Sequence, residues 1–316
     1  MKKRAPLVIG IILITISLIS LLYPFLSNSI NSFYSNSEIE NYSNNVNVLS
    51  SEDKNNYYKE AENYNIKLSD RVTKFTFSSE SVVENYDAIL NFNDGILGYI
   101  EIPKIDVKLP IYHGSDESVL SKGAAHVPNT AFPIGGKGNH TVISAHTAFP
   151  TQVFFDNLKD LTEGDYVYIS ILDDTLTYQV CDINIVEPTD IELLQANKEK
   201  DLLSLITCYP YAVNSHRLIV TTKYIDKSDV TATQDTVKVI DTHKSNNFIL
   251  IIFTILFVIA IMIAIIVVHK KSNKTINWQP LTYRRTLWGK ANFYSYYQYV
   301  YSSHQIPSCF SPMSTT

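Results

Sequence analysis

The sequence predicts a mostly β domain flanked by two transmembrane helices. Three observations lead to this fold class. Short β-branched and aromatic runs follow one another from Gly95 onward, and two uninterrupted apolar blocks lie outside that region, at residues 6–26 and 248–268. A run of about 20 apolar residues is the length at which a helix spans a bilayer.

The N-terminal block, PLVIGIILITISLISLLYPFL, follows Lys2, Lys3 and Arg4, and no charged residue follows it until Glu38. A cleaved signal peptide is the alternative to an anchor, but the block is long for a signal core and no small-x-small cleavage pattern comes after it. We therefore expect residues 6–26 to be an uncleaved transmembrane helix and residues 1–5 to be cytoplasmic.

The second block, FILIIFTILFVIAIMIAIIVV, contains no charged residue and is followed at once by His269, Lys270 and Lys271. A helix of this length in a soluble core is rarely apolar on every face. Residues 248–268 are therefore predicted to be a second transmembrane helix. Residues 269–316 form the predicted cytoplasmic tail, whose Tyr- and Ser-rich sequence indicates no function.

The charges are divided unevenly along the chain. All 31 acidic residues lie between Glu38 and Asp241, and both tails carry basic residues only. Lysine and arginine near membrane ends stay on the cytoplasmic side, so both termini are expected inside the cell and residues 27–247 outside, at the cell membrane. That external segment has 17 basic residues and a formal charge of −14, which argues against nucleic acid as a partner and favours a protein, a peptide or an envelope component.

The flanks of the β region are predicted to be less regular. Residues 27–65 are rich in Ser and Asn, with little periodicity before Tyr57, and are expected to form an extracellular stalk. Residues 66–94 are expected to be a lid or N-terminal helical region, in which Ser81 and Glu84 fit a capping box for a short helix over 81–90. Residues 227–247 are the expected tether to the second span.

Residues 95–226 have the size of one domain. Their strand-like runs are separated by Pro, Gly, Asn and Asp, and LDDTL has the composition of a hairpin turn between two strands. This pattern predicts a mostly antiparallel barrel or sandwich and does not choose between them. Two intervening segments, 151–161 and 190–203, are predicted to be helical.

Two of the three cysteines, Cys181 and Cys208, fall in this domain, whereas Cys309 is in the tail. A disulfide or two buried thiols is the ordinary interpretation. Cys208, however, ends an apolar run in LITCYPYAVNSHRLIV, and a reactive thiolate needs a cation or a histidine beside it. If 205–208 and 217–220 are adjacent strands, Arg217 lies opposite Cys208; His216 and Arg217 point to opposite faces, so only one of them faces the cysteine.

The external segment offers six candidate bases, and a structural role is the ordinary interpretation of each histidine. They are His113, His126, His140, His146, His216 and His243. None has metal-ligand spacing, so neither a metal site nor a cofactor is predicted. His146 stands out because it ends the strand-like run TVISA at a turn.

At these residues the chain resembles a known family. SLITCYPYAVNSHRLIV is similar to the sortase signature, HTVISAHTAFP to the segment that carries the sortase histidine, and residues 98–136 to the opening strands. The resemblance implies a closed sortase β-barrel in which Cys208 is the nucleophile, His146 the general acid and base, and Arg217 the residue that stabilises the substrate and its oxyanion. It also makes Thr207, and Phe77 within KFTFSS, candidates for substrate binding or a lid.

The second span makes the chain most similar to class C, pilin-polymerising sortases of Gram-positive surface proteins. This implies a transpeptidase that cleaves a Leu-Pro-x-Thr-Gly-like sorting signal between Thr and Gly through a thioester on Cys208. The acceptor amine would be a pilin lysine or a peptidoglycan precursor. Ser204, Ala145 and Thr147 depart from the family pattern, and the Asp-Pro-aromatic lid motif is absent.

Two alternatives to transpeptidation are left open by the sequence. One is a membrane-tethered, non-catalytic β-domain that binds a surface protein and contains a Cys181–Cys208 disulfide. The other is a cysteine peptidase, which would pass the thioester to water instead of an amine.

Overall fold

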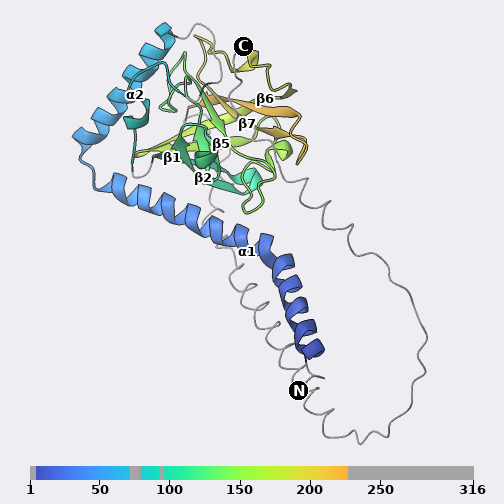
Figure 1. The fold of residues 1–316 in the computed structure, drawn as a ribbon. Coiled ribbons are helices and arrows are strands. Elements are labelled where there is room, and N and C mark those ends of the chain that lie inside the picture. Colours follow the sequence, from blue (N-terminus) through green and yellow to red (C-terminus); the bar gives the residue numbers. More distant parts are fainter. Residues whose placement is uncertain (1–4, 72–77, 79, 93–94, 227–316) are drawn as a thin grey trace, which may run out of the picture. The chain divides into compact units, whose positions relative to one another are not determined.

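The barrel that the resemblance implied is present. The computed structural model describes residues 5–71, 78, 80–92 and 95–226 (Figure 1). Eight strands close into one barrel in the order β1-β2-β3-β4-β7-β8-β6-β5. The strands are β1 Ile96–Ile102, β2 Val107–His113, β3 Ala124–His126, β4 His140–Ser144, β5 Tyr166–Ile171, β6 Asp174–Val186, β7 Leu202–Tyr209 and β8 His216–Ile225.

The pairing is mostly antiparallel, as the turn-rich sequence predicts, but two neighbouring pairs, β2 with β3 and β4 with β7, are parallel. The LDDTL segment forms the expected hairpin, in which Ile171 pairs with Asp174 across a two-residue turn. β1 and β5 come very close at Gly98, where an added Cβ would lie 2.4 Å from the carbonyl oxygen of Ser170. Only glycine fits this contact without a shift of the backbone.

The helices differ from the sequence predictions. They are α1 Ala5–Asn47, α2 Ser51–Arg71 and α3 Glu117–Leu120, with short 3-10 turns at η1 Tyr86–Ala88, η2 Pro103–Ile105, η3 Leu158–Asp160 and η4 Glu192–Leu194. The predictions of a helix at 81–90, 151–161 and 190–203 are therefore wrong, because each segment contains only a single 3-10 turn.

Two of these errors have a structural explanation, one local and one tertiary. The Ser81 hydroxyl accepts a hydrogen bond from the backbone of Val83, and Asn85 has a left-handed backbone with φ of 64°, which interrupts a helix. In the segment 190–203, Leu202 and Leu203 already belong to β7 and are buried between two other strands. Tertiary pairing overrides the local helical pattern there.

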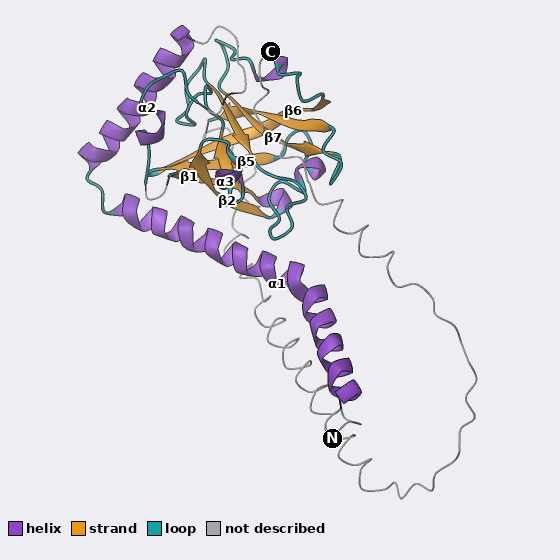
Figure 2. Ribbon diagram, in the orientation of Figure 1, coloured by secondary structure: helices purple, strands orange, loops and turns teal. Residues whose placement is uncertain are grey.

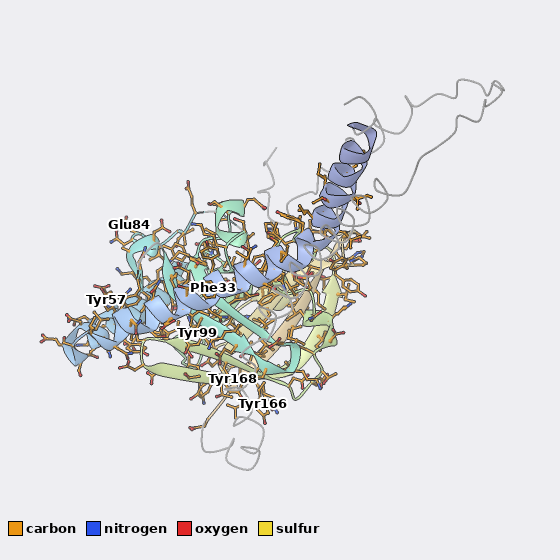
Figure 3. The ribbon with its side chains drawn as sticks, turned by 90° about the horizontal axis from the view of Figure 1, so that it is seen from below. Phe33, Tyr57, Glu84, Tyr99, Tyr166 and Tyr168 are labelled. Carbon is orange, nitrogen blue, oxygen red and sulfur yellow. The ribbon has the colours of Figure 1, made fainter. Side chains whose placement is uncertain are left out.

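Residues 27–65 differ from the expected stalk, because nearly all of them are helical (Figure 2). Each of the two helices also has buried side chains. In α1, Ser35, Ile39, Tyr42 and Val46 recur at helical spacing and are buried. α1 contacts β1 and β2, and Figure 3 shows it crossing these strands with the exposed Phe33 on its outer side. In α2, Ala61 and Tyr64 are fully or almost fully buried.

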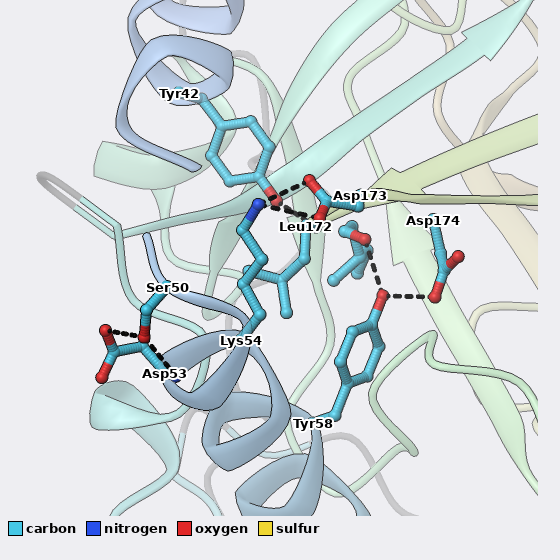
Figure 4. Close-up of polar contacts among 9 residues, drawn as sticks. Tyr42, Ser50, Asp53, Lys54, Tyr58, Leu172, Asp173 and Asp174 are labelled. Carbon is cyan, nitrogen blue, oxygen red and sulfur yellow. Dashed lines mark hydrogen bonds and ion pairs between the residues drawn. The ribbon is translucent and has the colours of Figure 1, made fainter. Parts of the chain in front are cut away.

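Residues of α1 and α2 on either side of the turn between them form hydrogen bonds and an ion pair with the β5–β6 hairpin (Figure 4). The Ser50 hydroxyl caps α2 by accepting a bond from the Asp53 backbone at 3.1 Å. Lys54 pairs with Asp173 at 2.8 Å, and the Tyr58 hydroxyl bonds to Asp174 at 2.8 Å. Tyr42 in α1 accepts a bond from the Leu172 backbone at 2.7 Å. These contacts attach the two helices to the barrel.

Among the described residues, no single helix passes a length and composition test for crossing a membrane. The bent pair Leu13–Leu21 and Leu26–Asn47, whose parts differ in direction by 46°, passes together. Pro24 lies at this bend, and a proline cannot donate the backbone hydrogen bond that a straight helix needs. Phe77, the tether 227–247, the span 248–268 and the tail 269–316 lie outside the described residues.

Candidate active site

Cys208 is fixed by a buried central strand. β7 is rich in Leu, Ile and Thr, and every residue from Leu202 to Cys208 is buried. It lies between β4 on one side and β8 on the other. Cys208 occupies the last buried position before the strand reaches the loop at Pro210. Residues at strand ends are held by the sheet while their side chains face a loop, which suits a functional group.

Arg217 lies directly opposite Cys208, as the sequence predicted. The antiparallel register of β7 and β8 pairs Cys208 with Arg217 and Tyr209 with His216. Paired residues of neighbouring strands share a face of the sheet. The structure therefore decides the open choice between the two basic residues: Arg217 is on the face of Cys208, and His216 is on the other face.

His146 lies just beyond the end of β4, at the same end of the sheet as Cys208. The parallel register with β7 ends at Ser144 opposite Ile206, and the Ala145 backbone continues it by donating to the Ile206 carbonyl at 3.2 Å. His146 and Cys208 are each two residues beyond the last pair, on adjacent strands. The three predicted catalytic residues therefore come together at one end of three neighbouring strands.

Thr207 forms hydrogen bonds between β7 and the segment that contains His146. Its hydroxyl donates to the Ala145 carbonyl at 2.7 Å and shares a 2.5 Å hydrogen bond with the Thr147 hydroxyl. Its side chain is 2% exposed. Thr207, predicted as a candidate for substrate binding, thus connects β7 to the histidine segment and belongs to the framework of the site.

The imidazole of His146 is enclosed by aromatic rings. It stacks on Phe149 with centroids 5.1 Å apart and planes inclined by 11°, and Phe154 lies 6.5 Å away. Its Nε2 atom is buried and makes no hydrogen bond within the described part of the chain. The nearest charge is the Glu117 carboxylate in α3, 3.4 Å from Nε2. A ring fixed by stacking with an unused nitrogen is suited to proton transfer.

Two opposing effects act on the pKa of His146. Burial lowers it by disfavouring the charged imidazolium, whereas the Glu117 carboxylate, and more weakly Asp156, raise it. Burial is the larger effect, so the pKa lies below its ordinary value. Imidazolium is thus the minor form at neutral pH.

Arg217 is held by its own loop. Its Nη1 donates to the carbonyl oxygens of His216 at 3.0 Å and Asn214 at 3.3 Å. Burial lowers the pKa of the guanidinium, but arginine stays charged at any physiological pH. The loop is tightly turned, because Ala212 and Asn214 both have left-handed backbones. The result is a fixed positive charge on the face of Cys208.

Comparison with known proteins identifies the family of this fold. The family model described as Sortase domain matches residues 100–225. A solved sortase C of Streptococcus pneumoniae is 33% identical, with a TM-score of 0.55, over 60% of this chain and 97% of its own. Sortase C1 of GBS pilus island 1 is 32% identical, with a TM-score of 0.56, over 61% and 92%. The chain belongs to the sortase family.

Among curated sortases, sortase D of Bacillus subtilis is 31% identical over 36% of this chain and 55% of its own length. Sortase A of Bacillus anthracis is 31% identical over 40% and 58%. The alignments thus span somewhat more than half of these relatives.

Cys181 is excluded as the partner of the candidate sortase nucleophile. It is a free thiol and occupies a bulge where β6 shifts register against Thr221 and Thr222 of β8. Thr221 is four residues, or about 13 Å, from Arg217 along the strand, whereas a disulfide needs Cα atoms within about 7 Å. Burial raises the pKa of Cys181, which makes it a poorer nucleophile.

Sequence reasoning missed three features of this sortase site. Glu117 was not considered, because nothing in the sequence places α3 beside His146. Tyr211 and Val213 in the β7–β8 loop are more than half exposed next to the paired Cys208 and Arg217. Exposed apolar side chains at a site rim are typical of binding surfaces, and their position in a short loop after the cysteine was the available signal.

No metal site is evident where the structure can be described. Across residues 5–71, 78, 80–92 and 95–226, no three His, Cys, Asp or Glu side chains are grouped to hold an ion.

Proposed function

We propose that this sortase is a membrane-anchored cysteine transpeptidase that cleaves a Leu-Pro-x-Thr-Gly-like sorting signal between Thr and Gly. The observation that carries the proposal is the placement of Cys208 opposite Arg217, with His146 leaving the adjacent strand at the same level. A nucleophile, a proton carrier and a fixed cation on neighbouring strand ends are the groups that acyl transfer requires.

The chemistry is a two-step exchange at one carbonyl carbon. Transfer of the Cys208 proton to His146 gives a thiolate and an imidazolium. The Cys208 thiolate attacks the Thr carbonyl, and Arg217 donates hydrogen bonds to the oxyanion that forms. The C–N bond to Gly then breaks, His146 protonates the departing amine, and a thioester to Sγ remains. An incoming amine attacks the thioester, His146 accepts its proton, and the new amide leaves while the thiolate is regenerated.

The acceptor we propose is a lysine amine of a pilin subunit, as in pilus assembly. The proposal is supported by the similarity to sortase C proteins, of which the Streptococcus pneumoniae enzyme is described in terms of pilin substrate specificity. A peptidoglycan-precursor amine is the second candidate, because the curated relatives carry the names sortase A and sortase D. The two candidates differ only in the amine that reaches the thioester.

The sequence and the charge distribution also support a membrane location. We propose that residues 6–26 and 248–268 span the cell membrane, with both termini cytoplasmic and the barrel outside. Fractionation of cells followed by mass spectrometry of the membrane-bound protein tests this. Recovery of an N-terminal peptide that includes residues 1–5 from the membrane fraction is expected, whereas a mature chain that begins after residue 26 would establish a cleaved signal peptide instead.

The activity itself is tested with the full chain in detergent, under reducing conditions, mixed with a Leu-Pro-x-Thr-Gly peptide. Intact-mass spectrometry compares the wild type with Cys208→Ala and with the matched control Cys181→Ala. We expect an acyl adduct on the wild type and on Cys181→Ala, none on Cys208→Ala, and loss of the adduct when a lysine-containing peptide is added.

Three other outcomes contradict parts of the proposal. An adduct that is released only to water identifies a peptidase. Transfer to a peptidoglycan-precursor amine but never to a lysine peptide identifies the wall-anchoring alternative. An adduct that persists in Cys208→Ala rules out Cys208 as the nucleophile.

A further inference from the structure

Helix α1 contacts the segment that follows the candidate catalytic histidine. The Asn28 side-chain oxygen accepts a bond from the Val153 backbone at 2.9 Å, and the Asn31 amide donates to the Thr151 carbonyl at 3.0 Å. Ser35, in turn, accepts a bond from the Gln152 side chain at 3.0 Å. The spacings of three and four residues put these side chains on one face of α1. Together they form a polar clamp, defined as Asn28, Asn31 and Ser35.

The clamped segment lies between the two aromatic rings that contact His146. Phe149, on which the imidazole stacks, comes just before the clamped residues, and Phe154, the second ring at the histidine, comes just after. The Phe155 backbone also donates to the His146 carbonyl at 3.0 Å. The aromatic rings around His146 therefore move if residues 151–153 move.

The segment between His146 and Asp156 contains a backbone conformation that is unfavourable by itself. Ala148 has a φ of 62°, a left-handed value that is costly for a residue with a Cβ. Asp156 offsets part of this cost by accepting bonds from the Ala148 and Phe154 backbones, both at 3.0 Å. Three further hydrogen bonds to residues 151–153 come from α1.

Polar bonds connect this end of α1 to the histidine segment beside a cavity. A cavity of about 310 Å³ is bordered by Asn31, Ser35 and Gln152 together with Glu38 and Lys122. One turn further along, the same face of α1 becomes apolar and buried at Ile39, Tyr42 and Val46. The three hydrogen bonds of the clamp connect residues 28–35 of α1 to the histidine segment.

We propose that the polar clamp is a positioning device for His146, so that α1 is part of the catalytic apparatus as well as the link to the predicted membrane span. The proposal rests on the transpeptidase function proposed above. Loss of the clamp leaves the nucleophile and Arg217 in place but lets the imidazole leave the geometry needed for proton transfer. A displacement of this kind slows the chemical step more than it weakens substrate binding.

The two asparagines allow a matched test, because their partners impose opposite roles. A backbone N–H can only donate, so Asn28 must accept; a carbonyl can only accept, so Asn31 must donate. Asn28→Asp keeps the accepting oxygen, whereas Asn31→Asp removes the donor, and both changes add the same charge to the same face of α1. Asn36→Asp, at an exposed position of the helix, controls for the charge alone.

The full chain in detergent is assayed for peptide transfer to a lysine amine and for hydrogen exchange by mass spectrometry. In Asn31→Asp we expect kcat to fall by about ten-fold with KM unchanged, and peptides that cover 147–156 to exchange faster while those of β7 and β8 do not. Asn36→Asp is expected to match the wild type in both measurements. Asn28→Asp, which keeps the oxygen that accepts the Val153 bond, is expected to exchange more slowly than Asn31→Asp over 147–156.

Wild-type kcat and wild-type exchange in Asn31→Asp would overturn the proposal. Faster exchange throughout the barrel would also overturn it, because the clamp would then contribute only to global stability. If the wild type transfers no peptide, the transpeptidase function fails; local exchange in the asparagine variants still decides whether α1 fixes the histidine segment.

Discussion

Arg217 and its neighbour His216 provide a test of the site at the residue scale. Arg217 shares a face with Cys208 and His216 does not. We expect Arg217→Lys to lower kcat/KM by about 100-fold, because an ammonium cannot reproduce the geometry of the guanidinium donors at the oxyanion. His216→Ala should stay close to the wild type. Steady-state transfer kinetics give both values, and a larger loss in His216→Ala would assign the two residues the other way round.

Glu117 is the residue whose charge acts most directly on His146. Its carboxylate raises the pKa of the imidazole against the effect of burial. Removing the carboxylate in Glu117→Gln should therefore lower the pKa of His146 further and move the corresponding limb of the pH–rate profile to lower pH. Because the Glu117 side chain is 58% exposed, the displacement should shrink as the salt concentration rises.

Asp116→Asn is the matched control for Glu117→Gln, since it removes an exposed carboxylate one residue away. This control should leave the pH–rate profile unchanged. Equal displacement of the limb in both variants would mean that the net charge of α3, and not the contact with Nε2, controls the histidine.

At the scale of elements, Tyr42 is the clearest link between α1 and the barrel. Its buried hydroxyl donates to the Leu97 carbonyl of β1 at 3.2 Å and accepts from the Leu172 backbone at the β5–β6 turn. Tyr42→Phe leaves the Leu172 N–H buried without this partner, so we expect a loss of about 1–3 kcal/mol of unfolding free energy. Thermal unfolding of the full chain measures it, with the exposed Tyr34→Phe as control. Equal melting temperatures for the two variants would contradict the role of Tyr42.

The strands could be predicted because their signal is local. Alternating β-branched residues and turn-forming residues predict β5, β6, β7 and β8. The antiparallel direction of the β7–β8 pair follows from the short loop between these strands. The parallel pairing of β4 with β7 joins segments about 60 residues apart, and no local pattern reports it. The position of His146 beside Cys208 therefore came from the family resemblance and not from periodicity.

The packing of α1 was missed for a different reason. The segment 27–47 contains many Ser and Asn residues, a composition typical of disorder. Its buried face is nevertheless regular, with Ser35, Ile39, Tyr42 and Val46 at alternating spacings of four and three. A search for periodicity that treats buried serine and asparagine as possible interface residues would have found this face and, with it, the polar clamp.

At the scale of the whole molecule, three buried histidines outside the candidate site make the stability of the described fold depend on pH, in addition to His146. Burial lowers the pKa values of His113, His126 and His140, and it brings His126 to about 3. His126 is completely buried, stacks on Phe132 and bonds to the Ala131 carbonyl. In the unfolded chain these side chains titrate near their ordinary value of about 6.5. The unfolded state therefore binds more protons than the folded state below that pH.

Stability should fall as the pH is lowered from about 6.5, because each neutral buried histidine favours folding above its unfolded pKa and loses that contribution as protons bind the unfolded chain. Asp201, whose pKa burial raises to about 6, opposes the trend between its ordinary value and 6, but three histidines outweigh one carboxyl. We expect His126→Gln to reduce the slope of stability against pH by up to about 1.4 kcal/mol per pH unit between pH 6 and 4. Melting temperatures of the full chain across this range test the prediction, with His216→Gln as the control that keeps the wild-type slope. An unchanged slope in His126→Gln would show that the buried imidazole is not the group that couples this barrel to acid.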